Sequence, residues 1–412
     1  MRALAMLRRG PIAMLWTGQC LSAMGDYFYF VALMWTAAKL TGNTAGVVAA
    51  AESWAALSVA ALGGVIADRV DRRRAMIVAD LGRAAAVGGL ALFALRGALG
   101  VAPLVVTALV LGCFDALFNP ALLASLPALC TAGRTDAEPS PGELQATNGL
   151  MDATRRIARA VGPSLAGAVA TVVPIAQFFV LDAASFAASA AAIYALGPRL
   201  AWKVDRGANT SRGVRSVFGD VAEGLRLVGG HPRAAWALAS VFLVNTTWAA
   251  GFQVGAVLLA SGPLSTALTG YAFLVGSYGA GNVVGNLVVG NIHVERKTTL
   301  IATSMVVLGT GFLLLAWAPS LPVAMLGASL AAIGGPMGGL PLISLLQSEF
   351  PSNRAGRIFS LRFMTEHAGV TTGLLLATPL YAFASVRVGI STCALTLVAG
   401  GAAMFARFGT RT

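Results

Sequence analysis

Charged residues are scarce in this chain: Asp, Glu, Lys and Arg make up 11% of its 412 residues, whereas soluble domains contain roughly 25%. Hydrophobic residues make up 57% and the mean hydropathy is +0.76, which excludes an ordinary soluble domain. Because a membrane-spanning helix needs about 20 apolar residues, a chain of this length has room for about twelve spans. We therefore expect one membrane domain and no sizeable soluble domain.

Cysteines and enzyme motifs are also sparse. The four cysteines lack the spacing of metal ligands or of a disulfide framework; they are Cys20, Cys113, Cys130 and Cys393. The sequence contains no nucleotide-binding Gly-Lys-Ser/Thr loop and no signature of a nucleophilic triad. We therefore predict neither an enzyme nor an ATP-driven pump, and we expect no cofactor and no bound metal.

Basic residues outnumber acidic ones by 29 to 17. They fall in short runs between apolar segments, which indicates orientation in a membrane rather than binding to nucleic acid. If both termini are cytoplasmic, only Lys39, Arg96 and Arg387 lie in outer loops, and the other 26 lie on the inner side. The positive-inside rule therefore predicts a multi-pass membrane protein, surrounded by lipid, with both termini in the cytoplasm.

Apolar runs predict an all-α protein with twelve transmembrane helices in two six-helix bundles. The first six spans are expected near 12–37, 44–67, 76–96, 101–124, 145–172 and 175–198. The second six are expected near 234–260, 267–290, 299–318, 321–347, 357–381 and 384–406. Residues 1–198 and 234–412 would form the two bundles, and 199–233 a cytoplasmic linker that contains an amphipathic helix.

An internal repeat supports two related halves. The segment Pro120–Pro127 resembles Pro341–Ser348, which lies 221 residues later. The charged loops after the second and eighth spans align at nearly the same offset. Halves related by a pseudo-two-fold axis along the membrane normal predict a central site between them.

The loop after the second span concentrates charge. Its sequence, Gly-Gly-Val-Ile-Ala-Asp-Arg-Val-Asp-Arg-Arg-Arg over residues 63–74, resembles the signature loop of the major facilitator superfamily. Asp71 departs from that signature, in which glycine is common. The resemblance implies a latch for one conformation, in which an acid caps a facing helix and pairs with arginines; its residues would be Gly64, Asp68, Arg69, Arg72 and Arg73. The alternative is a loop that only sets topology.

Other residues are similar to the enterobactin-exporter and macrolide-efflux group of that superfamily. They are Gly18-Gln19, Gly25-Asp26, Asp80, Arg83, Asp182 to Phe186, and the segment 351–360. The resemblance covers nearly the whole chain and implies a transporter of the bacterial cytoplasmic membrane, without indicating its substrate.

The fifth span resembles the exporter motif Gly-Pro-x-x-Gly-Gly at Gly162, Pro163 and Gly167, with Ala166 in place of one glycine. Such residues loosen a helix and let it bend, although a kink used only for packing is the alternative. The arginine that drug antiporters carry in the fourth span is missing from Leu111–Asp115. Near the inner surface, we expect Asp80 and Asp152 to pair with the arginines of the fifth span, Arg155, Arg156 and Arg159.

Acids within spans mark function, because a charge at the bilayer centre costs at least about 2.5–3.5 kcal/mol. We assign proton coupling first to Asp26 and second to Asp115, near the middle of the first and fourth spans. Glu52 and Glu366 are further candidates, and for Glu366 structural pairing is an equal alternative. For Asp26 the alternative is a fixed hydrogen bond to a neighbouring helix.

Polar and aromatic residues recur on one face of the seventh span. The predicted substrate cavity combines this stripe with the intramembrane acids; its residues are Asp26, Asp115, Asn119, Asn245, Trp248, Phe252, Tyr278 and Glu366. Packing is the alternative role for the aromatic residues.

Together these features predict a monomeric, proton-coupled antiporter that exports an amphipathic small molecule, such as a drug, siderophore or secondary metabolite. The alternative is an uncoupled facilitator or importer of a metabolite. A membrane receptor that transports nothing is a third reading, against which the acids in the spans argue.

Overall fold

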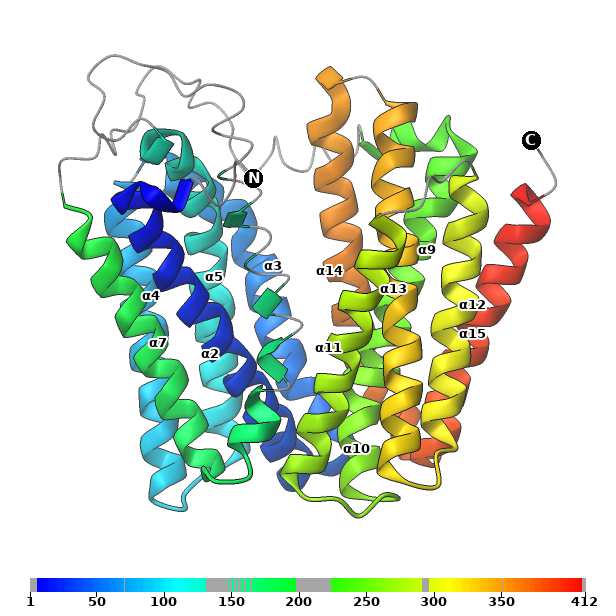
Figure 1. Cartoon of the computed structure of the whole chain (residues 1–412), viewed down its shortest axis with the longest axis horizontal. Helices are drawn as coiled ribbons and strands as arrows, with labels where there is room; N and C mark the ends of the chain where they lie inside the picture. The colour runs from blue at the N-terminus through cyan, green and yellow to red at the C-terminus, as the bar shows by residue number, and fades with distance from the viewer. Residues whose placement is uncertain are drawn as a thin grey trace. The chain divides into compact units, whose positions relative to one another are not determined.

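The computed structural model describes residues 6–69, 71–130, 165–197, 224–290, 296–350 and 352–409, together with residues 147, 150, 151, 154, 157, 158 and 161–163. Figure 1 shows that the elements in these ranges are helices, and none of the described residues forms a strand. A helix satisfies its own backbone hydrogen bonds, so it is one of the few structures that can cross lipid.

The predicted spans of the first half correspond to long helices. They are α2 (Gly10–Thr41), α3 (Ala45–Arg69), α4 (Arg72–Leu95), α5 (Val101–Cys130) and α7 (Ile175–Ala195), with short 3-10 turns η1 (Met6–Arg8) and η2 (Gly42–Thr44). The predicted span 145–172 is described only in part. Its residues 165–169 are helical.

The second half shows the same agreement. Its helices are α9 (Pro232–Trp248), the π-helical η3 (Ala249–Val254), α10 (Gly255–Ser261), α11 (Leu268–Gly290), α12 (Lys297–Ala316), α13 (Leu321–Glu349), α14 (Ser352–Phe383) and α15 (Val386–Phe408). Helices α9, η3 and α10 follow one another without a break and together form the predicted seventh span. Of the predicted linker, only residues 224–233 fall in the described ranges, and 224–229 are helical.

Within the described part of the chain, eight helices are long and apolar enough to cross a membrane. The chain is therefore an all-α, multi-pass membrane protein, as its composition predicted. Helices α2 and α14 are longer still, at 32 residues each, and coincide with two further predicted spans.

The chain divides into two compact units. The first consists of Met1–Leu33, Trp54–Gly162 and Val173–Val214, and the second of Met34–Ser53, Pro163–Val172 and Arg215–Thr412. The division into 1–198 and 234–412 stays a prediction. In the second unit α12 lies beside α13 and α15 (Figure 1).

Two segments of the first half of the sequence pack inside the second unit. The Trp35 ring at the end of α2 stacks on Tyr271 of α11, with ring centroids 6.1 Å apart. Gly46 of α3 lies against the backbone carbonyl of Leu374 in α14, where a side chain would not fit.

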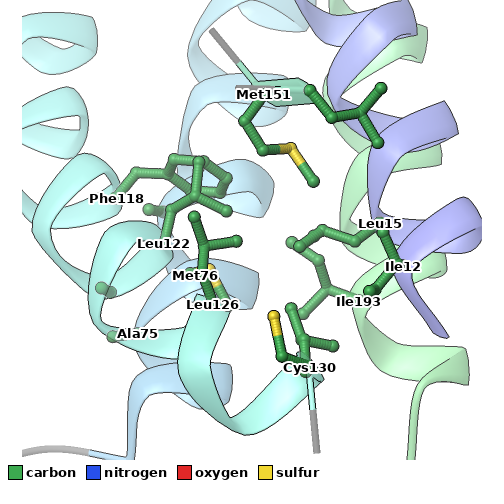
Figure 2. Packing of buried hydrophobic residues seen from close by; sticks show 14 residues of the cluster. Ile12, Leu15, Ala75, Met76, Phe118, Leu122, Leu126, Cys130, Met151 and Ile193 are labelled. Carbon is green, nitrogen blue, oxygen red and sulfur yellow. The ribbon is translucent and has the colours of Figure 1, made fainter. Parts of the chain in front are cut away.

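A hydrophobic cluster holds the first unit together at one end of its helices (Figure 2). It combines residues of α2, α4, α5 and α7 with two from the predicted fifth span; those labelled in the figure are Ile12, Leu15, Ala75, Met76, Phe118, Leu122, Leu126, Cys130, Met151 and Ile193. Between helices in lipid such side chains contribute by close van der Waals packing rather than by leaving water. The repeated segment Pro120–Pro127 thus supplies core residues.

The second unit contains a matching cluster. It draws on α9, α12, α13, α14 and α15; its members include Ala234, Leu238, Ile301, Leu342, Leu346, Ile358 and Met404. In both halves the cluster therefore uses the first, third, fourth, fifth and sixth spans. This correspondence agrees with the internal repeat, since Leu342 and Leu346 belong to its second copy.

Candidate functional site

Three charged residues lie midway along helices of the first unit: Asp26 on α2, Arg83 on α4 and Asp115 on α5. Arg83 is about 16 Å from the start of its helix at 1.5 Å per residue. Charged groups at this depth are expensive unless they are paired or reached by water. Their common position near the middle of the spans defines the candidate site.

Arg83 forms the centre of this site. Its guanidinium pairs with Asp115 at 2.6 Å, across from α4 to α5, and also with Asp80 one turn back on α4. The centroids of the Phe118 and Phe186 rings lie 4.4 Å and 4.6 Å from the guanidinium carbon. Since the Arg83 side chain is only 7% exposed, two carboxylates and two aromatic faces hold it in one place.

The two partners of Arg83 differ in their environment. Asp80 is fully buried, whereas the Asp115 side chain is 38% exposed. Asp80 also interacts with the Ser189 side chain of α7, and the Gln19 amide of α2 donates to the same hydroxyl over 3.2 Å. Asp80 is therefore the anchored partner, and Asp115 is the one that a ligand can approach.

Asp26 completes the site from α2. Its side chain is exposed, and it interacts electrostatically with Asp115, Arg83 and Asp80. Among the described residues, no basic group lies within ion-pairing distance of its carboxylate. The structure therefore brings together Asp26 and Asp115, the two acids that the sequence placed first and second for proton coupling.

Gly25 sets how closely α2 approaches α7. A Cβ atom at this position would lie 2.6 Å from the Asp182 carboxylate and against the Ser185 hydroxyl. Asp182 is itself buried, so the space cannot open easily. Because Gly25 has no side chain, α2 and α7 can pack closely at the residue that precedes Asp26.

The predicted aromatic residues come together in the second unit. The rings of Phe252 and Tyr278 stack with centroids 4.2 Å apart, and Trp248 lies 6.4 Å from Tyr278. Phe252 is buried, so it packs behind Tyr278. Asn245 donates to the carbonyl of Val241 on its own helix.

A π-helical turn interrupts this span at η3. Wide turns of this kind often occur at functional sites. The carbonyl of Ala250 accepts both the backbone N–H of Gly255, five residues on, and the Tyr381 hydroxyl of α14 over 2.9 Å. Gly255 makes room for this contact, since a Cβ there would meet the Tyr381 hydroxyl and Ile390.

Small residues on α14 bring it close to the same span. A Cβ at Gly369 would lie 2.7 Å from the carbonyl of Phe242, and one at Gly373 would meet the carbonyl of Thr246. Glycines four residues apart allow close packing of transmembrane helices. Helix α14 therefore packs closely against α9 up to the start of the π-helical turn.

The described part of the predicted latch loop shows how it is attached. Arg73 donates to the carbonyls of Ile193 and Tyr194, over 3.2 Å and 2.5 Å, at the end of α7. This placement satisfies free carbonyls and the negative end of the helix dipole. Asp71, the residue that departs from the signature, caps α4 by accepting the backbone N–H of Arg74. Arg72 is partly buried, and the side chains of Gly64, Asp68 and Arg69 fall outside the described part.

The exporter motif lies at a tight contact. A Cβ at Gly162 would be 2.6 Å from the Tyr27 ring, beside Asp26 on α2. Pro163 is buried, and Gly167 approaches the backbone of Ala272 in α11. Close packing is thus one role of these glycines, and bending stays a prediction.

Comparison with known proteins settles the family. The chain matches the Major Facilitator Superfamily over residues 15–373. The chain belongs to this superfamily. It is a membrane transporter and not an enzyme, as its residues predicted.

Relatives of this facilitator include efflux pumps. It is 30% identical to the multidrug efflux pump Tap of Mycobacterium tuberculosis over 413 residues, which cover 95% of this chain and 92% of that one. The pump of the same name from Mycobacterium bovis matches equally well.

Solved structures share the fold. The nucleoside transporter NupG superposes with a TM-score of 0.75 at 12% identity and covers 98% of this chain and 100% of its own. A POT family transporter in complex with 5-aminolevulinic acid gives a TM-score of 0.71 at 13% identity, with 97% and 96% covered. These two similarities concern the major facilitator fold alone.

Three other predicted site residues of this facilitator lie on α3, α5 and α14. Glu366 pairs with Arg362 over 3.2 Å, one turn back on α14, which is the structural alternative that the sequence left open. Glu52 lies on α3 and is partly exposed. Asn119 is exposed on α5 and donates to the carbonyl of Asp115.

The sequence analysis named Arg83 only as part of the family resemblance and counted it among the basic residues of the inner side. In the structure it lies midway along α4. The spacing of Asp80 and Arg83, three residues apart in an apolar helix, is the signal that favours an ion pair. Asp80 pairs with Arg83, whereas the arginines at 155, 156 and 159, its expected partners, lie outside the described residues.

Proposed function

We propose that this facilitator exports an amphipathic small molecule across the bacterial cytoplasmic membrane by alternating access, driven by inward movement of protons. The similarity to a multidrug efflux pump along nearly the whole chain supports the direction. The uneven distribution of basic residues supports an orientation with both termini in the cytoplasm. A monomer suffices for this activity, because the predicted site is formed by one chain.

The observation that carries the coupling proposal is the position of Asp26. It is an exposed acid midway along α2, near enough to a second accessible acid, Asp115, for their charges to repel. With both acids ionised, their repulsion is offset only in part, because one guanidinium serves Asp80 and Asp115 together. Uptake of a proton by Asp26 removes that repulsion.

Proton and substrate compete for Asp26 in this mechanism. The proton binds from the outer side, neutralises the acid and favours return of the empty site. Substrate binding on the inner side then displaces the proton. A ligand shifts a conformational equilibrium only by its different affinity for the two states, and the charge on Asp26 supplies that difference.

The loop after α3 would act as the latch for one of these states. Arg73 donates hydrogen bonds from the described part of the loop to the end of α7. These bonds fix the position at which α4 begins, next to the latch. Gly162 and Pro163 would let the fifth span bend during the exchange of access.

Everted membrane vesicles test the function. A thermal-shift screen of the purified protein first selects the compound that stabilises it most, and that compound is the transport probe. Respiring vesicles that contain the protein should accumulate the probe, and an uncoupler should abolish the accumulation. Accumulation that persists after the proton gradient has collapsed would instead support an uncoupled facilitator.

A further inference from the structure

A groove lies on the surface of the second unit between α12 and α15, which pack side by side (Figure 1). Its volume is about 320 Å³, at the lower end of the roughly 300–1,000 Å³ that ligand pockets occupy. The lining includes Ala302, Thr303 and Val306 of α12 and Gly401, Ala402 and Phe405 of α15. None of these six residues belongs to the central site of the first unit.

Close contacts between the two backbones form the floor of the groove. A Cβ atom at Gly401 would lie 2.7 Å from the carbonyl oxygen of Ala302, and one at Gly309 would lie 2.7 Å from that of Ala394. Residue numbers rise along α12 as they fall along α15, so the helices are antiparallel and the start of α12 lies beside the end of α15. Phe405, which is 48% exposed, contributes a wall.

The lining of the groove is apolar. Among the described residues that form it, Thr303 has the one polar side chain. Its hydroxyl donates to the carbonyl of Thr299, one turn back, over 2.9 Å, so its hydrogen bond is already made within α12. The lining therefore favours a hydrocarbon chain over a polar molecule.

The groove lies at the depth of one leaflet. At about 1.5 Å per residue, Val306 is about 14 Å from Lys297 at the start of α12, and Gly401 is about 10 Å from Phe408 at the end of α15. Half of the hydrocarbon core of a bilayer measures about 15 Å. A molecule that enters the groove therefore comes from the acyl region of that leaflet.

Positive charge is concentrated at the end of the groove nearest the membrane surface. Arg296 directly precedes α12, Arg407 lies in the last turn of α15, and both residues are exposed. Residues 295–297 and 407–412 together contain four basic residues and one acid. Basic pockets between transmembrane helices at the cytoplasmic side bind anionic lipid headgroups. The apolar groove and the charge beside it thus match the two ends of an anionic phospholipid.

We propose that this groove binds one anionic phospholipid, whose acyl chain lies between α12 and α15 and whose phosphate pairs with Arg296 and Arg407. The inference goes beyond the proposed transport and takes from it only the orientation, which places the site in the cytoplasmic leaflet. A second copy of the chain fits this face less well. Two copies inserted in the same direction and joined here would bring their arginines together on one side of the membrane, where like charges repel.

Native mass spectrometry of the delipidated full-length chain in detergent tests the inference with two probes, dioleoyl phosphatidylglycerol and dioleoyl phosphatidylcholine. The probes share both acyl chains and differ in net charge, so a difference in binding reports the headgroup. One phosphatidylglycerol per chain should be retained, more tightly than phosphatidylcholine by roughly fivefold for each arginine that pairs with it. Arg296→Gln should reduce this preference roughly fivefold.

Arg74→Gln is the matched control for charge. Arg74 is an exposed arginine at the start of α4, in the first unit, so its loss removes the same charge far along the chain from the groove. This variant should keep the preference for phosphatidylglycerol.

Ala402→Trp tests the groove itself. Its indole would fill the space between α12 and α15 and should weaken binding of phosphatidylglycerol roughly tenfold. Ala403→Trp is the matched control, because Ala403 is the next residue of α15 and is also exposed, but does not line the groove. It should bind the lipid as the wild type does.

The proposal fails if the wild type retains no phosphatidylglycerol, if it retains phosphatidylcholine equally, or if Ala402→Trp and Ala403→Trp bind alike. A species of twice the chain mass that Ala402→Trp abolishes would assign the groove to a second copy instead. None of these measurements involves the transported molecule. Vesicles that show no proton-driven accumulation would therefore reject the proposed transport and leave the lipid site standing.

Discussion

Replacing Arg83 with glutamine should destabilise this facilitator strongly. Loss of the guanidinium leaves the carboxylate of Asp80 fully buried without its counter-ion. Breaking a buried ion pair from one side costs about 3–5 kcal/mol, and the two aromatic contacts add to the loss, with about 0.5–2 kcal/mol for each cation–π pair. Because these terms overlap, we expect a loss of about 4 kcal/mol in the free energy of unfolding.

Reversible unfolding in mixed micelles measures this loss, with Arg362→Gln as the matched control. Arg362 also pairs with an acid of its own helix, at 3.2 Å, but the two side chains are 25% and 36% exposed. Ion pairs that remain in contact with solvent contribute about 0–1 kcal/mol. The control should therefore stay within about 1 kcal/mol of the wild type.

A double variant, Asp80→Asn with Arg83→Gln, separates the ion pair from general packing. Removing both charges eliminates the unpaired buried carboxylate, so the double variant should be more stable than Arg83→Gln alone. The reasoning would be refuted if Arg83→Gln cost no more than Arg362→Gln, or if the two single changes at Asp80 and Arg83 simply added.

Two further changes test close packing and the π-helical turn. Gly25→Ala should lower the free energy of unfolding by about 1–3 kcal/mol, because its Cβ would clash with Asp182. At the control position, Gly89, nothing lies within 4 Å, so Gly89→Ala should raise the free energy of unfolding by up to about 1 kcal/mol through helix propensity. A Gly25→Ala variant more stable than the wild type would contradict the contact. Tyr381→Phe removes one of the two hydrogen bonds to Ala250 and should cost about 0.5–1.5 kcal/mol, and an unchanged unfolding midpoint would show that this bond does not brace the turn.

The positions of the spans could be predicted well from the sequence, because apolar runs and helix length are set by the bilayer. The predicted span 101–124 lies within α5, and 321–347 lies within α13. The internal repeat at Pro120 and Pro341 predicted two related halves, and its two copies lie in α5 and α13, which contribute to matching hydrophobic clusters.

Side-chain partners could be predicted less well. Asp26 and Asp115 were recognised because an acid in an apolar run is conspicuous. The ion pair of Asp115 with Arg83 depends instead on how α4 and α5 pack, which periodicity does not encode. The pair of Arg362 and Glu366 was visible in principle, since residues four apart meet on a helix. The sequence analysis left structural pairing of Glu366 open without naming Arg362 as its partner.

The π-helical turn and the cap of α4 could not be predicted from the sequence either. Nothing in the composition of Ala249–Val254 distinguishes a π-helical turn from an α-helical one, because the turn is stabilised from another helix by Tyr381. Similarly, the capping acid of α4 is Asp71, which the sequence comparison treated only as a departure from the family signature.

Substrate-driven proton release from proteoliposomes tests the central claim most directly. Wild-type protein and Asp26→Asn are reconstituted with a pH indicator, and the compound selected by thermal shift is added while proton movement is recorded. We expect the wild type to exchange protons for the compound, and Asp26→Asn, whose thermal shift should show residual binding, to move none. Wild-type proton flux through Asp26→Asn would contradict the account and transfer the coupling role to Asp115.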